Sequence, residues 1–237
     1  MMFSSVFLLG FLAAGCYGAT KYEANSYIDA ALRTYLPNHV RNLRLDPAKL
    51  PDFDVKLKSH LVLGQRKFKG KFTEGALYGL SNVARRGDCS APGWQGTNVT
   101  IGCYISLDGV RAHYHVTSKG DSLFSSKKKY GAEEVRRRLD RQEHQCLCGS
   151  HSSVRNTNAF VEVTQRRPGP PTVKTLSVDR ILLSLSVSKE LKLNQDRLRQ
   201  LEDSVKETVE RSVRDVLYWQ FRKALDLSFA GMPMPNV

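Results

Sequence analysis

Residues 194–229 read NQDRLRQLEDSVKETVERSVRDVLYWQFRKALDLSF, with no glycine or proline among them. Apolar residues recur in this run at steps of three and four, which is the period of one face of an α-helix. They are Leu198, Leu201, Val205, Val209, Val213, Val216, Leu217, Phe221, Ala224 and Leu225. At about 1.5 Å per residue, the predicted helix is about 50 Å long. Such a helix needs an equally long apolar partner, which the rest of the chain must supply.

The ends and the polar face of this run also favour a helix. Asn194 is a good N-cap, and Asp196 places a negative charge in the first turn. Gly231 and Pro233 are expected to end the helix. An acid precedes a base by four residues three times, which is the favoured order for helical ion pairs. These pairs are Glu202 with Lys206, Glu207 with Arg211, and Glu210 with Arg214.

The composition is that of a globular, basic protein. The chain has 237 residues, of which 41% are hydrophobic, and this content argues against general disorder. The formal net charge of +13 favours anionic partners. Charge alone does not choose among nucleic acid, glycosaminoglycan, an anionic membrane and small anions.

The N-terminus predicts a secretory signal peptide over residues 1–18. Residues 3–15 are uncharged and apolar but too few to span a bilayer, and cleavage after Gly18 suits the small residues there. No Lys or Arg precedes the apolar run, and Ala13–Cys16 also resembles a bacterial lipoprotein box. We therefore expect a secreted, extracellular protein with a single domain at 19–237 and a basic insertion at about 118–145.

Four cysteines remain after removal of the signal peptide: Cys89, Cys103, Cys146 and Cys148. An even number in a secreted chain predicts two disulfides. We expect Cys89 and Cys103 each to pair with one member of the Cys-x-Cys pair, since a bridge within that pair would close a very small strained ring. The alternative is a Cys89–Cys103 bridge. In a eukaryotic secretory pathway, Asn98 in the Asn-Val-Thr sequence is an expected glycosylation site.

The remainder of the chain predicts a first helix and then a series of strands. The first helix covers residues 21–36, and Pro37 is expected to end it. Two alternating runs meet at Asp108 and Gly109, which is a strong hairpin signal. Strand-like patterns occupy 55–86, 99–107, 110–116, 146–163 and 172–187. Strands bracketed by helices predict the α+β class with an antiparallel sheet.

Two short motifs carry a resemblance to a known group of proteins. They are DPAKLPD at 46–52 and GALYGL at 75–80. With the order of the elements, they resemble the mite group 7 allergens and, more distantly, the insect juvenile-hormone-binding and takeout proteins. All belong to the tubular lipid-binding superfamily that includes the bactericidal permeability-increasing protein. The resemblance implies an arthropod, allergen-like protein with a long curved antiparallel sheet wrapped around the C-terminal helix, and a shorter N-terminal helix.

The resemblance also implies carriage of a hydrophobic or lipid-like ligand in an apolar cavity between helix and sheet. The alternative is that the apolar stripe belongs to an ordinary packed core, as in most amphipathic helices. Because β-branched valines leave more room than Leu or Phe, the middle of the helix is the expected cavity wall. The predicted ligand-binding residues are Val205, Val209, Val213, Val216 and Phe221 of the helix, with Phe72, Leu80, Ile105, Tyr114, Val161 and Leu183 of the strands.

The basic segment provides an alternative function as a binder of anionic surfaces such as glycosaminoglycan, lipopolysaccharide or phospholipid. Its predicted anion-binding residues are Lys127, Lys128, Lys129, Arg136, Arg137 and Arg138. The other interpretation is a solvated charged insertion without a partner. Nucleic acid is disfavoured because only Tyr130 lies among these charges, whereas stacking sites interleave aromatics with basic residues.

Little in the sequence points to catalysis. His144, Cys146, Cys148 and His151 have a spacing that could bind zinc, but the secretory context favours disulfides, so no metal is expected. His113 and His115 share one face of a strand without an accompanying nucleophile pattern. Common hydrolase, P-loop and dinucleotide motifs are absent. We expect a non-enzymatic protein without a cofactor, the alternative being a secreted hydrolase with scattered catalytic residues.

Overall fold

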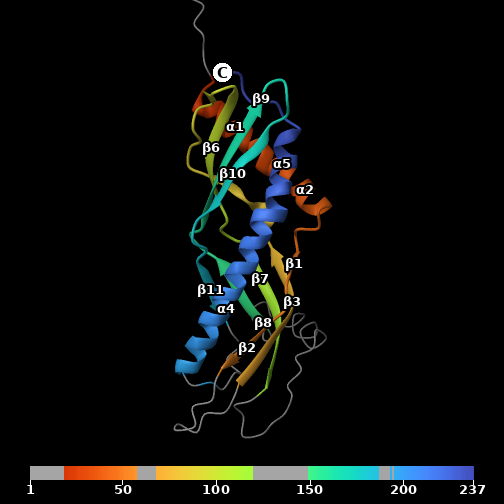
Figure 1. Ribbon diagram of the computed structural model, residues 1–237, viewed down its shortest axis with the longest axis vertical. Coiled ribbons are helices and arrows are strands. Elements are labelled where there is room, and N and C mark those ends of the chain that lie inside the picture. The colour runs from red at the N-terminus through yellow and green to blue at the C-terminus, as the bar shows by residue number, and fades with distance from the viewer. Residues whose placement is uncertain (1–18, 58–67, 120–148, 187–192, 194) are drawn as a thin grey trace, which may run out of the picture.

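A computed structural model describes residues 19–57, 68–119, 149–186, 193 and 195–237. The long C-terminal helix is confirmed. It comprises α4 (Gln195–Val216), a π-helical turn η4 (Leu217–Phe221) and α5 (Arg222–Ala230), and it ends at Gly231. The three predicted ion pairs form on its outer face, with N–O distances of 3.9, 3.1 and 3.0 Å. Figure 1 shows this helix running along the long axis of the molecule.

The N-terminal helix is longer than predicted. It comprises α1 (Lys21–Ala30), the π-helical turn η1 (Ala31–Tyr35) and α2 (Leu36–Asn42). The prediction that Pro37 ends the helix was wrong. Proline cannot donate to a carbonyl four residues earlier and its ring crowds that carbonyl. The π-turn just before Pro37 changes the hydrogen-bonding register, so that the proline stands in the first turn of α2, where its missing N–H is tolerated.

The strands pair antiparallel in two sheets, and the structure confirms the α+β class with curved antiparallel sheets against a long helix. Among the described residues, the first sheet has the order β1-β3-β7-β8-β11, with β2 also on β3. The second has the order β10-β9-β6-β4, with β5 also on β6. The first sheet contains β1 (Ala48–Leu50), β2 (Phe53–Leu57), β3 (Phe68–Tyr78), β7 (Arg111–Lys119), β8 (Gly149–Val154) and β11 (Leu183–Ser186). The second contains β4 (Ala84–Arg86), β5 (Gly93–Gln95), β6 (Asn98–Ser106), β9 (Asn158–Arg166) and β10 (Thr172–Val178).

The turn at Asp108 and Gly109 does not form the predicted hairpin. It connects β6 of the second sheet to β7 of the first, and these two strands pair with other neighbours. The amide of Val110 donates to the Leu107 carbonyl at 3.2 Å, so a tight turn is present. The chain crosses again between β8 and β9, where Val154 donates to Val110 and Leu107 donates to Thr157, both at 2.9 Å. These bonds fix the crossing point, which we call the waist.

The two motifs that carry the family resemblance contact each other. Strand β1 pairs with residues 75–77 of β3, in the register Leu50 opposite Gly75. The Asp46 carboxylate accepts from the amides of Gly79 and Ser81 at 2.9 and 3.1 Å, and also from the Ser81 hydroxyl. At the other end, Asp52 accepts from the amide of Glu74 at 3.0 Å. The residues of the two motifs therefore hold the end of β3 against β1, so their role in this structure is to stabilise the fold.

The long helix joins the two halves of the molecule. Its α4 part packs against β1, β2 and β11 of the first sheet, whereas α5 packs against β10 of the second sheet and against the N-terminal helix. The N-terminal helix in turn contacts β4. A hydrophobic core of buried residues runs through both halves. Within the described ranges, no helix is both long and apolar enough to span a bilayer.

Candidate functional site

The predicted ligand-binding residues of the helix form one buried row. Val205, Val209 and Phe221 are 0% exposed, Val213 is 1% exposed and Val216 is 6% exposed. They belong to the hydrophobic core that the helix shares with the strands. The helix thus presents β-branched side chains to the interior over three turns, as the periodicity predicted.

The predicted strand residues lie in the interior but are divided between the two halves of the molecule. Phe72 and Tyr114 are fully buried in the first sheet, where Leu183 is half-buried near its edge. Ile105 and Val161 are buried in the second sheet. Leu80 is buried in the short 3₁₀ turn η3 (Leu80–Asn82) at the waist. The structure therefore brings Phe72 and Tyr114 together under α4 and places the other buried strand residues farther along the molecule.

An aromatic cluster forms the strand side of the interior under α4. The rings of Phe53 and Phe72 stack with centroids 4.5 Å apart, and Tyr114 meets Phe53 edge-on at 5.1 Å. Gly75 makes room for this arrangement, because a Cβ atom there would lie 2.3 Å from the Tyr114 ring. Phe53 was not among the predicted site residues, although it alternates with the buried residues Val55 and Leu57 in β2.

Two hydroxyl groups are also buried on the inner face of the first sheet. Tyr114 of β7 and Ser150 of β8 are directly opposite each other in the register, and they are 0% and 1% exposed. Neither hydroxyl has a hydrogen-bond partner in the described part of the chain. The Ser212 hydroxyl of α4 donates to the Thr208 carbonyl at 3.0 Å and lies close to Tyr114, without the geometry of a hydrogen bond between the two hydroxyls. Burial raises the pKa of Tyr114 to about 12, and the nearby Ser212 opposes this rise.

The disulfide pairing corrects the prediction. Cys89 bonds to Cys103, with Cα atoms 4.5 Å apart, so pairing of these two cysteines with Cys146 and Cys148 was wrong. The loop after β4 returns alongside β6, where Ser90 and Gly102 exchange two hydrogen bonds: the Ser90 amide donates to the Gly102 carbonyl at 2.9 Å, and the Gly102 amide donates to the Ser90 hydroxyl at 2.8 Å. This return places Cys89 beside Cys103. Cys146 and Cys148 lie outside the described residues.

The structure tests the remaining predicted residues in part or not at all, because many of them lie outside the described ranges. The basic residues at 127–129 and 136–138 lie outside the described ranges, so their anion-binding role stays a prediction. Asn98 is half-buried at the first position of β6. Of the four residues with zinc-like spacing, only His151 is described, and the described residues contain no group of three or more His, Cys, Asp or Glu side chains placed to hold a metal.

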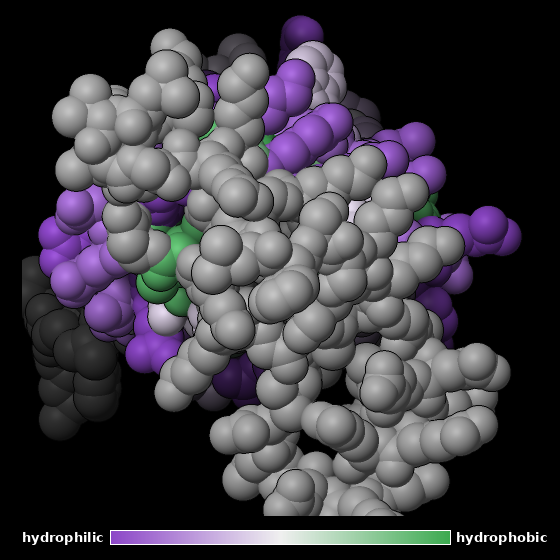
Figure 2. Space-filling view, turned by 90° about the horizontal axis from the view of Figure 1, so that it is seen from below, coloured by the Kyte–Doolittle hydropathy of each residue, from purple (hydrophilic) through white to green (hydrophobic). Residues whose placement is uncertain are grey.

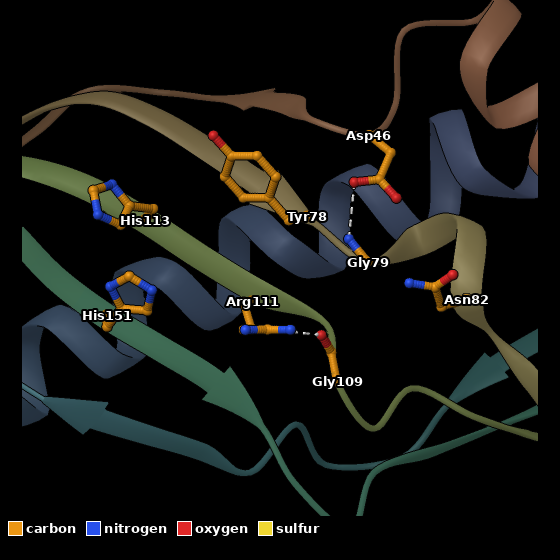
Figure 3. Close-up of a pocket in the computed structure, with 8 residues that line it drawn as sticks. All are labelled: Asp46, Tyr78, Gly79, Asn82, Gly109, Arg111, His113 and His151. Carbon is orange, nitrogen blue, oxygen red and sulfur yellow. Dashed lines mark hydrogen bonds between the residues drawn. The ribbon is translucent and has the colours of Figure 1, made fainter. Parts of the chain in front are cut away.

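A surface pocket of about 490 Å³ opens at the waist (Figure 3). Figure 3 shows its side chains in front of the strands, with the long helix behind them. The pocket is lined by Asp46, Tyr78, Gly79, Asn82, Gly109, Arg111, His113 and His151. The sequence feature that could have indicated this pocket is the alternation of Arg111, His113 and His115, which lie on the outward face of β7.

Two histidines dominate one side of this pocket. The rings of His113 and His151, paired across β7 and β8, have centroids 4.7 Å apart. His115 lies 5.9 Å from His113 and is held by Glu74, with 3.4 Å between Nε2 and the carboxylate. Burial lowers the pKa of His113, and His151 and His115 lower it further. Burial and Arg111 likewise lower the pKa of His151. Both rings are therefore neutral at pH 7, and a neutral imidazole has one nitrogen that can donate a hydrogen bond and one that can accept.

The surface at the end of the molecule where α4 begins is more hydrophilic than the buried interior. Viewed along the long axis from that end, the described surface is largely hydrophilic around a small hydrophobic patch (Figure 2).

Comparisons with known proteins extend the resemblance seen in the sequence. No protein-family model matches the chain. It is similar to the salivary anticoagulant protein P23 of Ixodes scapularis, with 23% identity over 240 residues that cover 100% of both chains. Among solved structures, it is similar to takeout 1 of Epiphyas postvittana, with a TM-score of 0.43 and 16% identity, over 86% of this chain and 91% of that one. It is also similar to a lipopolysaccharide-binding protein, with a TM-score of 0.42 and 16% identity, over 86% of this chain and 39% of that one.

Proposed function

We propose that this chain is a secreted, non-enzymatic carrier or scavenger that encloses a hydrophobic or lipid-like ligand between α4 and the sheets. The observation that carries the proposal is the row of buried valines on α4 facing the aromatic side chains of the first sheet. Elongated helix–sheet interiors with such walls suit the burial of a long apolar molecule. The proposed wall consists of Val205, Val209, Val213 and Val216 with Phe72 and Tyr114 near the middle of α4, and Phe221, Leu80, Ile105, Val161 and Leu183 beyond them.

The driving force for binding is the removal of ligand surface from water. Burial contributes roughly 25 cal/mol per Å² before the costs of association. A ligand that buries about 300 Å² therefore gains roughly 7 kcal/mol gross. Part of this gain offsets the lost freedom of the ligand, and polar groups at a few points fix its orientation.

Tryptophan substitutions at the valine row test the proposal. Val209→Trp and Val213→Trp fill the space that a ligand would occupy, so each should abolish binding of a neutral hydrophobic fluorescent dye while the protein stays folded. In a close-packed core, the same changes would instead overpack the site and cost about 1–3 kcal/mol or more of unfolding free energy. Glu207→Trp is the matched control, because Glu207 is exposed on the outer face of the same helix.

The same variants and the wild type also define the result that would reject the proposed carrier function. Unfolding of both valine variants, together with no dye binding by the wild-type chain and no lipid in solvent extracts of the native protein, would leave a solid core. Glu207→Trp should bind the dye like the wild type, since it adds the same indole without entering the interior.

A second candidate function follows from the relative in tick saliva. The relative covers the whole chain and is named a salivary anticoagulant. The net charge of +13 favours attraction to anionic surfaces, whether glycosaminoglycan or phospholipid. We propose that the chain delays blood clotting through its basic residues. Plasma clotting times should lengthen as the concentration of the wild-type protein increases. A variant with Lys127–Lys129 and Arg136–Arg138 changed to serine should not lengthen them. Unchanged clotting times with the wild type would reject this function without affecting the carrier.

A further inference from the structure

The outward face of the first sheet carries two cross-strand pairs that line the waist pocket. Tyr78 of β3 is opposite Arg111 of β7, and His113 of β7 is opposite His151 of β8. Residues two positions apart on a strand point to the same side, so the two pairs are neighbours on one face. The residue opposite His113 on β3 is Ala76, whose small side chain leaves the imidazole accessible from that strand.

The hydrogen-bonding groups of these side chains are not satisfied within the part of the chain that the structure describes. Neither imidazole makes a hydrogen bond or an ion pair there, and the two rings meet edge-on, at an interplanar angle of 84°. The Arg111 guanidinium makes one long hydrogen bond, from Nε to the Gly109 carbonyl at 3.4 Å, so its terminal nitrogens stay available. The pocket therefore presents N–H donors from β7 and β8 to one space.

The positive charge in the pocket has no described carboxylate in contact with it. After burial, the charge of Arg111 is the second cause that lowers the pKa of His151, so the guanidinium acts on that ring. The Glu74 carboxylate lies 3.4 Å from Nε2 of His115 and thus pairs with a different ring. An anion in the pocket would supply the negative charge that the guanidinium and the two imidazoles lack.

The pocket is larger than an inorganic anion needs. Its volume of about 490 Å³ lies in the range of small-molecule sites. The half-exposed ring of Tyr78 provides a flat apolar surface beside it. Asp46 lies at the other end from the histidines (Figure 3), where its carboxylate accepts from the amides of Gly79 and Ser81. An organic group of modest size therefore has room next to the histidine end.

We propose that the waist pocket binds a small organic phosphate monoester, whose phosphate group is held by Arg111, His113 and His151. This inference goes beyond the proposed carrier function and does not depend on it. A guanidinium donates two parallel hydrogen bonds to phosphate oxygens, and each neutral imidazole can donate one more. The terminal oxygens of a phosphate point in different directions, which suits donors that arrive from neighbouring strands, whereas the two oxygens of a carboxylate lie in one plane.

Calorimetric titration of the full mature chain with three matched probes tests the class of ligand. Phenyl phosphate, phenyl sulfate and benzoate each carry one aromatic ring and differ in the anionic group. At about pH 7.5, phenyl phosphate is mainly a dianion, because the second pKa of a phosphate monoester is about 6. We expect it to bind about tenfold more tightly than the two monoanions, which is the effect of one additional charge-assisted hydrogen bond.

Two variants identify the residues responsible. Arg111→Gln and His151→Ala should each weaken phenyl phosphate binding by about tenfold or more and hardly change the thermal midpoint, since neither side chain is held by an ion pair among the described residues. Arg199→Gln is the matched control, because it removes the same charge from an exposed position on α4. It should bind phenyl phosphate like the wild type, and so should the variant with Lys127–Lys129 and Arg136–Arg138 changed to serine.

Vesicles separate a soluble ligand from a lipid head group of the same chemistry. Phosphatidic acid carries a phosphate monoester, so phosphatidylcholine vesicles with and without it are the probes. If the ligand is a lipid, the wild type should sediment with the phosphatidic acid vesicles, phenyl phosphate should displace it, and Arg111→Gln should stay in solution. If the ligand is soluble, phenyl phosphate binding should depend on Arg111 while vesicle binding does not.

Four results would overturn the inference. They are no binding of phenyl phosphate by the wild type, equally tight binding of all three probes, an equal loss in Arg199→Gln, and a loss in the serine variant of the basic segment with none in Arg111→Gln. Binding that a chelator abolishes would also overturn it, since the histidines would then hold a metal ion. None of these results alters the carrier function, which is measured by binding of a neutral dye.

Discussion

Replacing Cys89 and Cys103 together with alanine is expected to lower the free energy of unfolding by about 3 kcal/mol. The two residues are 14 positions apart, so the bond closes a loop of about 15 residues, and closure of such a loop in the unfolded chain accounts for about 3 kcal/mol. Both side chains are also buried, so the loss of two sulfur atoms from the core acts in the same direction. For a chain of this size, the expected decrease in thermal midpoint is about 6–12 °C.

Urea unfolding and thermal melts under non-reducing conditions measure this effect. A reducing agent should bring the wild type toward the midpoint of the double variant. The matched control changes Cys146 and Cys148 to serine, and it should keep the Cys89–Cys103 peptide in a non-reducing digest. Both cysteines are removed together because a single substitution would leave a free thiol able to form a new bridge.

Two results would refute this reasoning. One is a double variant with the midpoint of the wild type, which would mean that the loop is already constrained without the bond. The contacts that could do so are two hydrogen bonds with Asn25 of α1: the Cys89 amide donates to the Asn25 side-chain oxygen, and the Asn25 side-chain nitrogen donates to the Asp88 carboxylate. The other is a non-reducing peptide that joins Cys89 to Cys146 or Cys148.

Three further predictions concern the ends, the charge and the pH response of the molecule. N-terminal sequencing of secreted protein should begin near Ala19, and a retained Met1 or a lipid on Cys16 would contradict the signal peptide. Six basic residues would be changed to serine: Lys127, Lys128, Lys129, Arg136, Arg137 and Arg138. This variant should be retained less strongly on heparin, most clearly at low salt, and the free energy of unfolding should change by less than about 0.5 kcal/mol per exposed site. The free energy of unfolding should fall as the pH falls from about 7 toward 5. The reason is that the pKa values of His113 and His151 are lowered in the folded state. In the unfolded chain these histidines bind protons first, near the ordinary histidine pKa of about 6.5, and this favours unfolding. His113→Gln should flatten this dependence in urea titrations at the two pH values, whereas His39→Gln on α2 serves as a control, and equal slopes for all three proteins would contradict the assignment.

The local features of the long helix could be predicted from the sequence. The apolar period placed Val205, Val209 and Val213 in the interior, and the acid–base spacing gave the three ion pairs on the outer face. Both signals act between residues three or four positions apart, so a helix brings them together whatever surrounds it. The alternation of the strands gave the α+β class in the same way, since a strand shows its buried face in its own sequence.

The site could be predicted only in part. The alternation of residues 110–116 placed Tyr114 on one face of a strand, but its grouping with Phe53 and Phe72 under α4 depends on which strands pair. The opposed hydroxyls of Tyr114 and Ser150 were not found, because serine in a strand carries no signal of what lies above it. The waist pocket was missed for a similar reason: its lining comes from residues between 46 and 151 that a crossing of the chain brings together.

The sequence by itself determined the amphipathic helix, the antiparallel class of the strands and the residues with a buried face. Only the tertiary structure decided that the Asp108–Gly109 turn passes between two sheets, that Cys89 bonds to Cys103, and that the first helix continues past Pro37. A turn signal fixes a local change of direction, but the pairing of the following strand depends on competing edges elsewhere in the chain. Disulfide partners likewise depend on distances that non-local pairing sets, whereas periodicity within an element is carried by its own residues.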